Sequence, residues 1–364
     1  MPRPPKTPRP ARKPPARPQP VTVHTCEADV PEGLERIARS ELRRRFEARL
    51  ESIAMTPGAL RFTYAGNLYQ LLTLRTAQAV YLSRRYPIPR PRALLGDQHW
   101  RALLAQIAAV RELSPAGAYR TFHLSAAGPD TGVMRRLREA LAATTGLEPD
   151  DEAGDLLVRL RHPPDDDQIW EALVRLSPRP LSARAWRVCN REGALNAAIA
   201  HAMIFLTQPA PDDVFLNPVC GSGTLLIERL AAAPAAQVTG YDHDEAALDC
   251  ARRNVEAAGL GEQISLRLGD CRALPLAAGS VDAIAADLPF GHLVGSHEHN
   301  LELYPALLAE AARVIRPGGR CVVISHEVRL MEMLLVASPH WSVEQIIRVA
   351  QGGLYPRIFV LVRR

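Results

Sequence analysis

Apolar residues in the second half of this 364-residue chain form short runs, separated by longer segments whose apolar positions have a helical spacing. One helical segment covers residues 245–258 and is ended by Gly259. Strands that alternate with helices in this way predict a parallel sheet, whose ligand binds at the carboxyl ends of the strands. The expected strands cover residues 214–216, 238–241, 264–268, 281–286, 320–325, 341–349 and 358–362.

The first half of the chain shows two shorter α/β patterns. The first has one clear helix at residues 31–50, and the second has strands at 121–125 and 155–160 around a helix at 132–143. Several prolines and three consecutive aspartates then predict a linker. The expected division is a disordered Pro/Arg-rich tail at 1–20, α/β units at 21–95 and 96–162, a linker at 163–183 and a C-terminal domain at 184–364.

Composition narrows the class of protein. The length allows two or three domains with a sizeable core. No apolar stretch is long enough for a membrane span, and no signal-peptide pattern follows the first residues, so a cytoplasmic protein is expected. The six cysteines form no C-x-x-C pair, which predicts free thiols, a reducing compartment and no structural zinc.

The segment Asn217-Pro-Val-Cys-Gly-Ser-Gly-Thr224 lies between an expected strand and an expected helix. Backbone N–H groups at the start of such a helix bind nucleotide-like ligands. The dinucleotide pattern needs a third glycine where this chain has Leu226, and the lysine of an ATP-binding loop is absent. The loop therefore favours a ligand with an adenosine end and no phosphates.

Three carboxylates follow at the ends of the next strands. Asp242 comes 19 residues after Gly223 and is placed to accept both ribose hydroxyls. Asp270 is placed to accept the adenine amino group. Asp287 opens the segment Asp-Leu-Pro-Phe290, which combines a carboxylate, a proline and an aromatic ring. Such a segment suits an enzyme that holds a flat base and an amine.

These motifs resemble those of the class I S-adenosylmethionine-dependent methyltransferases, and more narrowly the THUMP-containing RNA guanine-N2 methyltransferases that modify tRNA. The resemblance covers roughly residues 21–364. It implies a Rossmann-like domain with a seven-stranded doubly wound sheet, preceded by a ferredoxin-like domain at 21–95 and a THUMP domain at 96–162. It also implies S-adenosylmethionine as cofactor and tRNA as substrate, with the N-terminal module holding the tRNA 3′ end.

The resemblance assigns cofactor-binding roles to residues of five segments. Residues 193–196 open the helix that flanks the cofactor, and Cys220 fills the glycine turn rather than acting as a nucleophile. The expected cofactor-binding residues are Asn196, Asn217, Pro218, Cys220, Gly221, Ser222, Gly223, Thr224, Tyr241, Asp242, Asp270, Cys271 and Asp287.

The expected catalytic residues are Asp287, Leu288, Pro289 and Phe290. The guanine amine is a poor nucleophile because its lone pair is delocalised into the ring. The Asp287 carboxylate and the Leu288 carbonyl are expected to accept one N–H each and to turn the lone pair toward the methyl group. Pro289 fixes the backbone, and Phe290 stacks on the extruded base. Leu288 stands where many amino-methylating enzymes have a first proline, which favours guanine over adenine.

Charge is concentrated at one end of the chain. Residues 1–20 hold six Lys/Arg, no acid and nine prolines, so this segment carries +6, and the remaining 344 residues carry −1 of the +5 net charge. The tail is expected to be a disordered, soluble segment, an RNA-grasping arm, or both. Elsewhere RNA is expected to bind local basic clusters, although each cluster is as consistent with the solvent-exposed face of a helix. The clusters are Arg43 to Arg45, Arg84 with Arg85, and Arg135, Arg136 and Arg138.

Several alternatives stay open at this point. His292, His297 and His299 lie close together, but no acidic or cysteine ligand stands at a zinc spacing, so no metal is expected. The other enzymes considered are a ribosomal RNA guanine-N2 methyltransferase and an adenine-N6 methyltransferase. A non-catalytic RNA-binding protein with a relic fold is disfavoured, because Asp242, Asp270 and Asp287 are all present. The chain is expected to act as a monomer, without a membrane or a metal.

Overall fold

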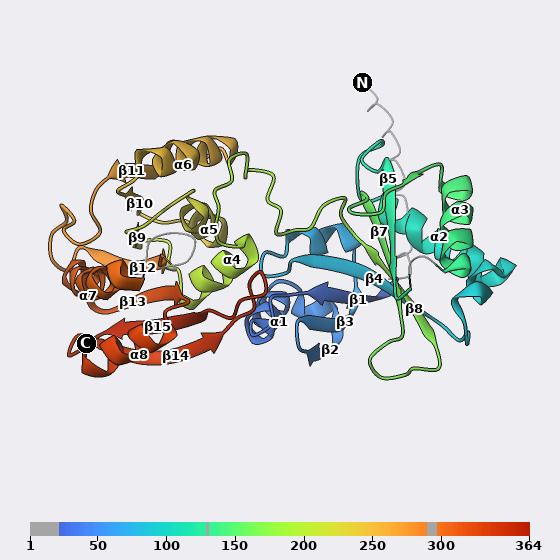
Figure 1. The fold of residues 1–364 in the computed structure, drawn as a ribbon, viewed down its shortest axis with the longest axis horizontal. Coiled ribbons are helices and arrows are strands. Elements are labelled where there is room, and N and C mark those ends of the chain that lie inside the picture. The colour runs from blue at the N-terminus through green and yellow to red at the C-terminus, as the bar shows by residue number, and fades with distance from the viewer. Residues whose placement is uncertain (1–21, 129–130, 290–296) are drawn as a thin grey trace, which may run out of the picture.

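The computed structural model describes residues 22–128, 131–289 and 297–364. The expectations for the tail at 1–20, for Phe290 and for His292 lie outside these ranges. Figure 1 shows an elongated molecule with one sheet in each half of the chain. Within the described ranges, no helix has the length and apolar character needed to cross a membrane.

The N-terminal half forms one sheet in the order β2-β3-β1-β4-β8-β7-β5-β6. Three helices pack apolar residues on this sheet, together with residues of the connecting segments: α1 (Glu35–Phe46), α2 (Asp97–Arg111) and α3 (Gly132–Thr145). The strands are β1 (Val23–Asp29), β2 (Leu50–Thr56), β3 (Ala59–Ala65), β4 (Ala79–Tyr86), β5 (Thr121–Ala126), β6 (Glu148–Pro149), β7 (Leu156–Arg161) and β8 (Trp170–Arg175).

Strand β8 departs from the sequence-based division of the chain. It lies within the segment 163–183, which was expected to be a linker, and it pairs antiparallel with both β4 and β7. Its side chains are mostly buried, including Ala172, Leu173 and Val174. The two expected α/β units are therefore joined edge to edge in one sheet. The neighbouring prolines and aspartates obscured a strand that long-range pairing stabilises.

The first helix is also shorter than expected. Residues 31–50 were expected to be helical, whereas α1 ends at Phe46, a 3₁₀ turn covers Glu47–Arg49, and β2 begins at Leu50. At its start, the Glu35 carboxylate accepts the backbone N–H of Gly33 at 3.0 and 3.1 Å. The local chain thus turns into the helix later than the apolar pattern alone indicates.

The C-terminal half forms the second sheet, in the order β11-β10-β9-β12-β13-β15-β14. Its pairings are parallel except that β15 runs antiparallel to β13 and β14. This is the doubly wound sheet that the strand and helix spacing predicts. The strands are β9 (Val214–Asn217), β10 (Gln237–Asp242), β11 (Ile264–Leu268), β12 (Val281–Asp287), β13 (Ile315–Ser325), β14 (Trp341–Arg348) and β15 (Arg357–Arg363).

Alternating side chains of these strands form two apolar cores, one on each face. Phe215 points to the core that contains α4 (Ala197–Leu206), α5 (Thr224–Ala232) and α6 (Glu245–Ala257). Leu216, the next residue, points to the core that contains α7 (His297–Val314) and α8 (Val328–Ala337). Burial on both faces explains why these strands read as continuous apolar runs.

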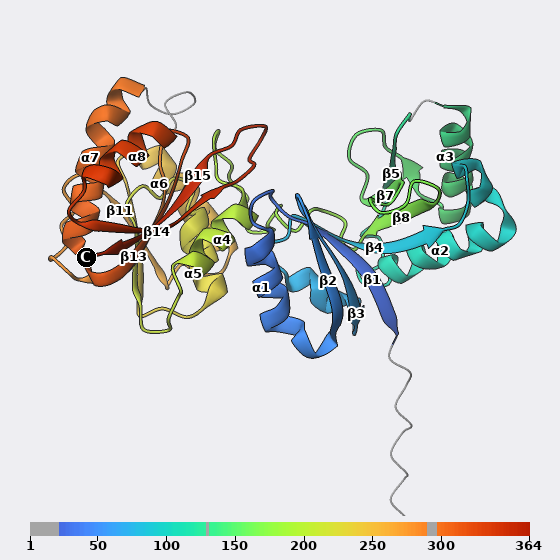
Figure 2. The same cartoon turned by 90° about the horizontal axis from the view of Figure 1, so that it is seen from below.

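The two halves of the chain pack against each other. Figure 2 shows α1 beside α4 and near the ends of β14 and β15. Leu34 and Ile37 belong to the same apolar core as α4, together with Ile347 at the end of β14. A Cβ on Gly33 would collide with the Arg348 carbonyl oxygen, so the β14–β15 hairpin requires glycine there.

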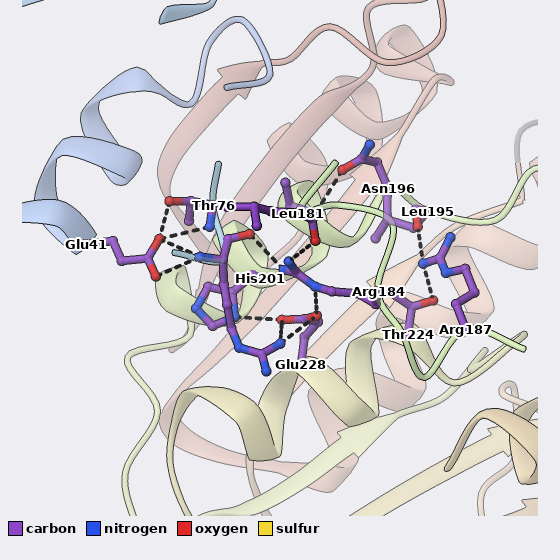
Figure 3. A network of polar contacts seen from close by, with 12 residues as sticks. Glu41, Thr76, Leu181, Arg184, Arg187, Leu195, Asn196, His201, Thr224 and Glu228 are labelled. Carbon is purple, nitrogen blue, oxygen red and sulfur yellow. Dashed lines mark hydrogen bonds and ion pairs between the residues drawn. The ribbon is translucent and has the colours of Figure 1, made fainter. Parts of the chain in front are cut away.

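A buried carboxylate, Glu228 on α5, connects the halves through ion pairs (Figure 3). It accepts hydrogen bonds from Arg75 at 3.2 Å, from Arg184 at 2.8 Å and from His201 at 2.9 Å. Burial alone would raise the pKa of Glu228, but the His201 hydrogen bond and the two arginine charges hold it at about 2. Glu41 on α1 binds the backbone N–H of Arg75, which fixes the N-terminal partner of this network.

Candidate active site

The loop between β9 and α5 contains two glycines in the left-handed region. Gly221 has φ 52° and Gly223 has φ 81°, conformations that disfavour other residues. Gly223 is also the N-cap of α5. A Cβ added to Gly221 would meet nothing within 4 Å, so its backbone borders open space. The loop therefore presents a bare backbone at the start of a helix.

Asp242, at the end of β10, holds this loop in place. Its carboxylate accepts the backbone N–H of Gly221 at 2.8 Å and that of Asp244 at 3.0 Å. The Cys220 N–H donates to the Tyr241 carbonyl at 2.8 Å, which makes a second link between loop and strand. An ionised carboxylate has about four lone-pair sites, so Asp242 keeps acceptor capacity for ribose hydroxyls.

Asp270 has a different environment from the one expected for an adenine acceptor. Both of its oxygens accept hydrogen bonds from Arg272, at 2.7 to 3.0 Å, and its side chain is 46% exposed. The hydrogen bonds and charge of Arg272 lower the pKa of Asp270. An adenine amino group would therefore have to share this carboxylate with the guanidinium.

Other residues assigned to the cofactor serve the local fold. Asn196 caps α4 by accepting the Ala198 N–H at 2.8 Å, and Asn217 accepts the Val219 N–H at 3.2 Å. The Thr224 hydroxyl accepts from Arg187 at 2.9 Å. The remaining residues assigned to the cofactor in this region are buried or half-buried around the loop: Pro218, Ser222, Tyr241 and Cys271.

The cysteines differ from the expectation of six free thiols. Cys189 and Cys250 form a disulfide, with 5.4 Å between their Cα atoms. Their separation of 61 residues gives no pattern that a sequence could reveal, and only the packing of α6 brings them together. Free thiols therefore no longer support the expectation of a reducing compartment. Cys220 is buried, and burial raises the pKa of its thiol, in keeping with a filler of the turn.

Asp287 ends β12 and carries an unusual carboxylate. Its Oδ1 is buried and has no hydrogen-bond partner within the described ranges. Burial raises the pKa of Asp287 to about 8. A buried acceptor without a partner is costly, and such groups gather at functional sites. Of the three expected site carboxylates Asp242, Asp270 and Asp287, only Asp287 has a buried oxygen without a hydrogen-bond partner in the described ranges, and the buried Tyr241 hydroxyl also lacks one there.

The backbone after Asp287 is firmly held. The Leu288 N–H donates to the Ile324 carbonyl at 3.0 Å. The Pro289 carbonyl accepts from the Asn300 side chain at 3.1 Å and from the Tyr304 hydroxyl at 2.7 Å. Asn300 and Tyr304 lie on α7, in a segment whose supporting role no short motif marks. The motif thus has a fixed backbone, as Pro289 alone suggested.

The glycine loop and Asp287 lie at the same edge of the sheet. Strand β12 pairs with β9 in parallel, with Ile284 opposite Leu216. The carboxyl ends of parallel neighbours lie side by side, which is where open α/β sheets bind their ligands. The fold therefore places a ligand cradle next to a buried carboxylate that can accept an N–H.

Comparisons with known proteins agree with this geometry. The family model described as RMKL-like, methyltransferase domain, matches residues 184–357. A tRNA (guanine(6)-N2)-methyltransferase from Thermus thermophilus is 31% identical over 344 residues, which is 92% of this chain and 98% of the relative. The chain belongs to the tRNA guanine-N2 methyltransferase family. The crystal structure of TrmN from Thermus thermophilus is 29% identical, with a TM-score of 0.74 over 94% of this chain and all of that chain.

Other relatives match less than half of the chain. A tRNA (guanine(6)-N(2))-methyltransferase THUMP3 from Bos taurus is 32% identical over 182 residues, 46% of this chain and 36% of the relative. A U6 snRNA (guanine-N(2))-methyltransferase THUMPD2 from Bos taurus is 34% identical over 148 residues, 41% of this chain and 28% of the relative. This member of the family thus spans about a third of the length of these two relatives.

The methyltransferase family uses S-adenosylmethionine, and the residues present fit that group. The open side of Gly221 admits close approach of a ligand to the backbone. Asp242 is 8% exposed and retains lone pairs for two hydroxyls. Together, the loop and Asp242 would hold the methionine and ribose parts, and the bound cofactor would supply a methyl group on a positively charged sulfur.

His297, one of the histidines after the motif, has a carboxylate partner. His297 Nδ1 lies 3.0 Å from each oxygen of Glu327, and the hydrogen bond raises the pKa of His297. Within the described ranges, no group of three or more His, Cys, Asp or Glu side chains is placed to hold a metal ion.

Two residues that sequence reasoning missed stabilise the glycine loop by hydrogen bonds. Asn254 on α6 is fully buried and donates to the carbonyls of Cys189 and Ser222, at 2.9 and 3.0 Å. Arg187 donates to the Leu195 carbonyl at 2.8 Å and to Thr224. Neither residue lies in a motif, because their partners are distant in sequence.

Proposed function

We propose that this protein transfers a methyl group from S-adenosylmethionine to the N2 amine of a guanosine in tRNA, within the acceptor stem. The observation that carries this proposal is the buried Asp287 Oδ1, an acceptor without a partner in the described ranges, at the end of the strand beside the glycine loop. Such an acceptor matches an amine, which brings the N–H donors that the site lacks.

Asp287 and its neighbour act on the amine in two ways. The Asp287 carboxylate and the Leu288 carbonyl each accept one N–H, so the nitrogen lone pair turns toward the methyl group. As the C–S bond breaks and the N–C bond forms, the nitrogen becomes positive and its N–H acidic. In its ionised form, Asp287 is a competent acceptor for the proton that the nitrogen then loses, because its raised pKa makes the carboxylate a stronger base. The fixed Pro289 carbonyl keeps these acceptors in position before the reaction.

The proposal assigns RNA binding to the N-terminal half, as a ferredoxin-like unit and a THUMP unit that hold the tRNA 3′ end. Support comes from the Thermus relative named for tRNA, since its match extends over 92% of the chain and so includes this half. The relative named for U6 snRNA matches only 41% of the chain. Guanine is favoured over adenine because the named relatives are guanine-N2 enzymes. A monomer that acts in the cytoplasm completes the proposal.

Nucleoside mass spectrometry tests the target atom. Full-length protein is incubated with unmodified tRNA and S-adenosylmethionine that carries a labelled methyl group. The expected product is labelled N2-methylguanosine at one position of the acceptor stem. A tRNA with inosine at that position should accept no methyl, because inosine lacks the N2 amine and otherwise resembles guanosine.

Two results would contradict the proposal. Label in N6-methyladenosine would mean that the amine belongs to another base. Transfer to the inosine-bearing tRNA at the normal rate would mean that the N2 atom is not the target. Ribosomal RNA and U6 snRNA serve as competing substrates in the same assay, and faster methylation of either would reassign the RNA class.

A further inference from the structure

A cavity of about 580 Å³ opens between the N-terminal ends of α7 and α8. Its volume is within the range of pockets that hold small ligands such as a nucleoside. The cavity lies beyond the carboxyl end of β13, the strand next to the one that carries Asp287. It is lined by His297, Leu301, His326, Glu327, Val328, Arg329, Leu330 and Met333.

Hydrogen bonds connect this cavity to the acceptor motif. The Tyr304 hydroxyl lies 2.7 Å from the Pro289 carbonyl oxygen and 2.9 Å from Ser325 Oγ. The same Ser325 oxygen accepts the Glu327 backbone N–H at 2.9 Å. Pro289 and Glu327 are therefore bound to a common pair of hydroxyls.

The cavity lining combines apolar side chains with the largely buried carboxylate of Glu327 and, at the rim, basic side chains. Leu301 and Met333 are 47% and 60% exposed and line the same cavity, so they offer apolar contact to a flat ring. The Glu327 side chain is 18% exposed and His297 orients its carboxylate, which keeps further lone pairs. Arg329 is exposed at the edge.

This distribution of charge favours a base inside the cavity and a phosphate outside it. A carboxylate repels phosphate, but it accepts N–H groups on the edge of a base. Guanine carries an N1–H directly beside its N2 amine, whereas adenine has an unprotonated N1 that a carboxylate repels. Arg329 has the charge that a backbone phosphate requires.

We infer that this cavity receives the base of the target guanosine and that Glu327 is a specificity-determining residue that accepts the guanine N1–H. The inference rests on the proposed function, since it supplies the second contact of the same base. Asp287 and Leu288 then hold the amine that reacts, and Glu327 distinguishes a protonated N1 from an unprotonated N1.

Base analogues test this role of Glu327. The substrates are tRNAs with guanosine or 2-aminopurine riboside at the target position; 2-aminopurine has the 2-amino group but an unprotonated N1. Single-turnover methylation by wild-type protein should strongly favour guanosine. In Glu327→Gln the side-chain amide can donate to an unprotonated N1. Guanosine methylation should fall by about tenfold to a hundredfold, the usual effect of a lost base contact, and the preference for guanosine over 2-aminopurine should shrink by a similar factor.

Glu332→Gln is the matched control, because Glu332 lies on the same helix, pairs with Arg357 and does not line the cavity. It should leave both rates unchanged. Binding of S-adenosylmethionine and the melting temperature of Glu327→Gln should equal those of the wild type, which separates a specific effect from misfolding. A second variant, Glu327→Asp, retains the charge on a shorter side chain and should keep the guanosine preference while lowering the rate.

Each outcome has a distinct meaning. An unchanged preference for guanosine in Glu327→Gln, with normal methylation of guanosine by the wild type, would overturn the role of Glu327 and leave the proposed function intact. A wild-type protein that methylates neither analogue-bearing nor guanosine-bearing tRNA at N2 would instead contradict the proposed function.

Discussion

Two neighbouring regions at the carboxyl ends of the strands differ in how their carboxylates are paired. We call the ends of β9 and β10 the cofactor edge, and the ends of β12 and β13 the acceptor edge. At the ends of β9 and β10, Asp242 has protein partners on both oxygens, and the loop at Cys220 is bonded to the next strand. At the ends of β12 and β13, Asp287 Oδ1 is buried without a partner in the described ranges, and a cavity lies beyond the end of β13. The fold pairs Asp242, whereas Asp287 Oδ1 has no donor in the described ranges.

This contrast indicates where the protein gives up stability for function. A satisfied network makes a rigid cradle, which suits a cofactor that is bound in the same way at each turnover. A buried carboxylate without a partner destabilises the folded state, and natural proteins retain such groups where chemistry needs them. The contrast therefore predicts opposite effects of substitutions at the two edges.

The largest effect is expected for methyl transfer in Asp287→Asn. Asparagine keeps the shape but offers a donor where the amine needs a second acceptor, so single-turnover transfer to tRNA should fall by about a hundredfold or more. Affinity for S-adenosylmethionine should change much less. A variant that retains full transfer would remove Asp287 from the chemistry and with it the difference between the two edges.

Asp242→Ala should act on the other edge. The substitution removes the acceptor for the Gly221 N–H as well as the proposed ribose contacts. Affinity for S-adenosylmethionine, measured by calorimetry, should weaken by roughly 2–4 kcal/mol, the range for hydrogen bonds to charged groups. Unchanged affinity would mean that Asp242 serves the loop alone. Asp249→Ala on the exposed side of α6 is the control.

Glu228→Gln should show how far the cofactor edge depends on the N-terminal half. The substitution leaves Arg184 and Arg75 without their carboxylate, and unfolding by denaturant at pH 7 should show a loss of about 2–3 kcal/mol. The pKa of Glu228 is held at about 2, below its ordinary value, so its contribution is present above about pH 4.5 and is lost as pH falls toward 2. A difference between variant and wild type that is equally large near pH 2 would contradict this origin.

The smallest effect is a gain in stability in Asp287→Asn. The pKa of Asp287 is raised to about 8, so the folded protein favours the protonated form. That contribution is full below pH 4 and is lost as pH rises through about 8. Without cofactor or RNA, the variant should melt about 2–4 °C above the wild type at pH 9, and the gain should shrink at pH 6. A variant that melts lower at pH 9 would mean that the carboxylate stabilises the fold.

Local sequence rules determined much of the C-terminal domain. The glycine loop was predictable because left-handed backbone at Gly221 and Gly223 strongly favours glycine, and because a helix must begin where its apolar spacing begins. The positions of the strands along the chain followed from the spacing of apolar runs, since a parallel sheet buries both faces. The placement of Asp287 at the end of β12 followed from the same pattern.

Only the tertiary structure decided which groups are paired. The pairing of β8 with β4, the disulfide between Cys189 and Cys250, and the partners of Glu228 all join residues far apart in the chain. Asp270 and Asp287 show the same limit. Both stand at or just after the carboxyl end of a strand, but Asp270 is bound by Arg272 whereas Asp287 is buried without a partner on Oδ1 in the described ranges. A sequence specifies where a carboxylate stands along a strand. Its protonation and reactivity depend on neighbours that folding brings from elsewhere, because burial and charge act through space.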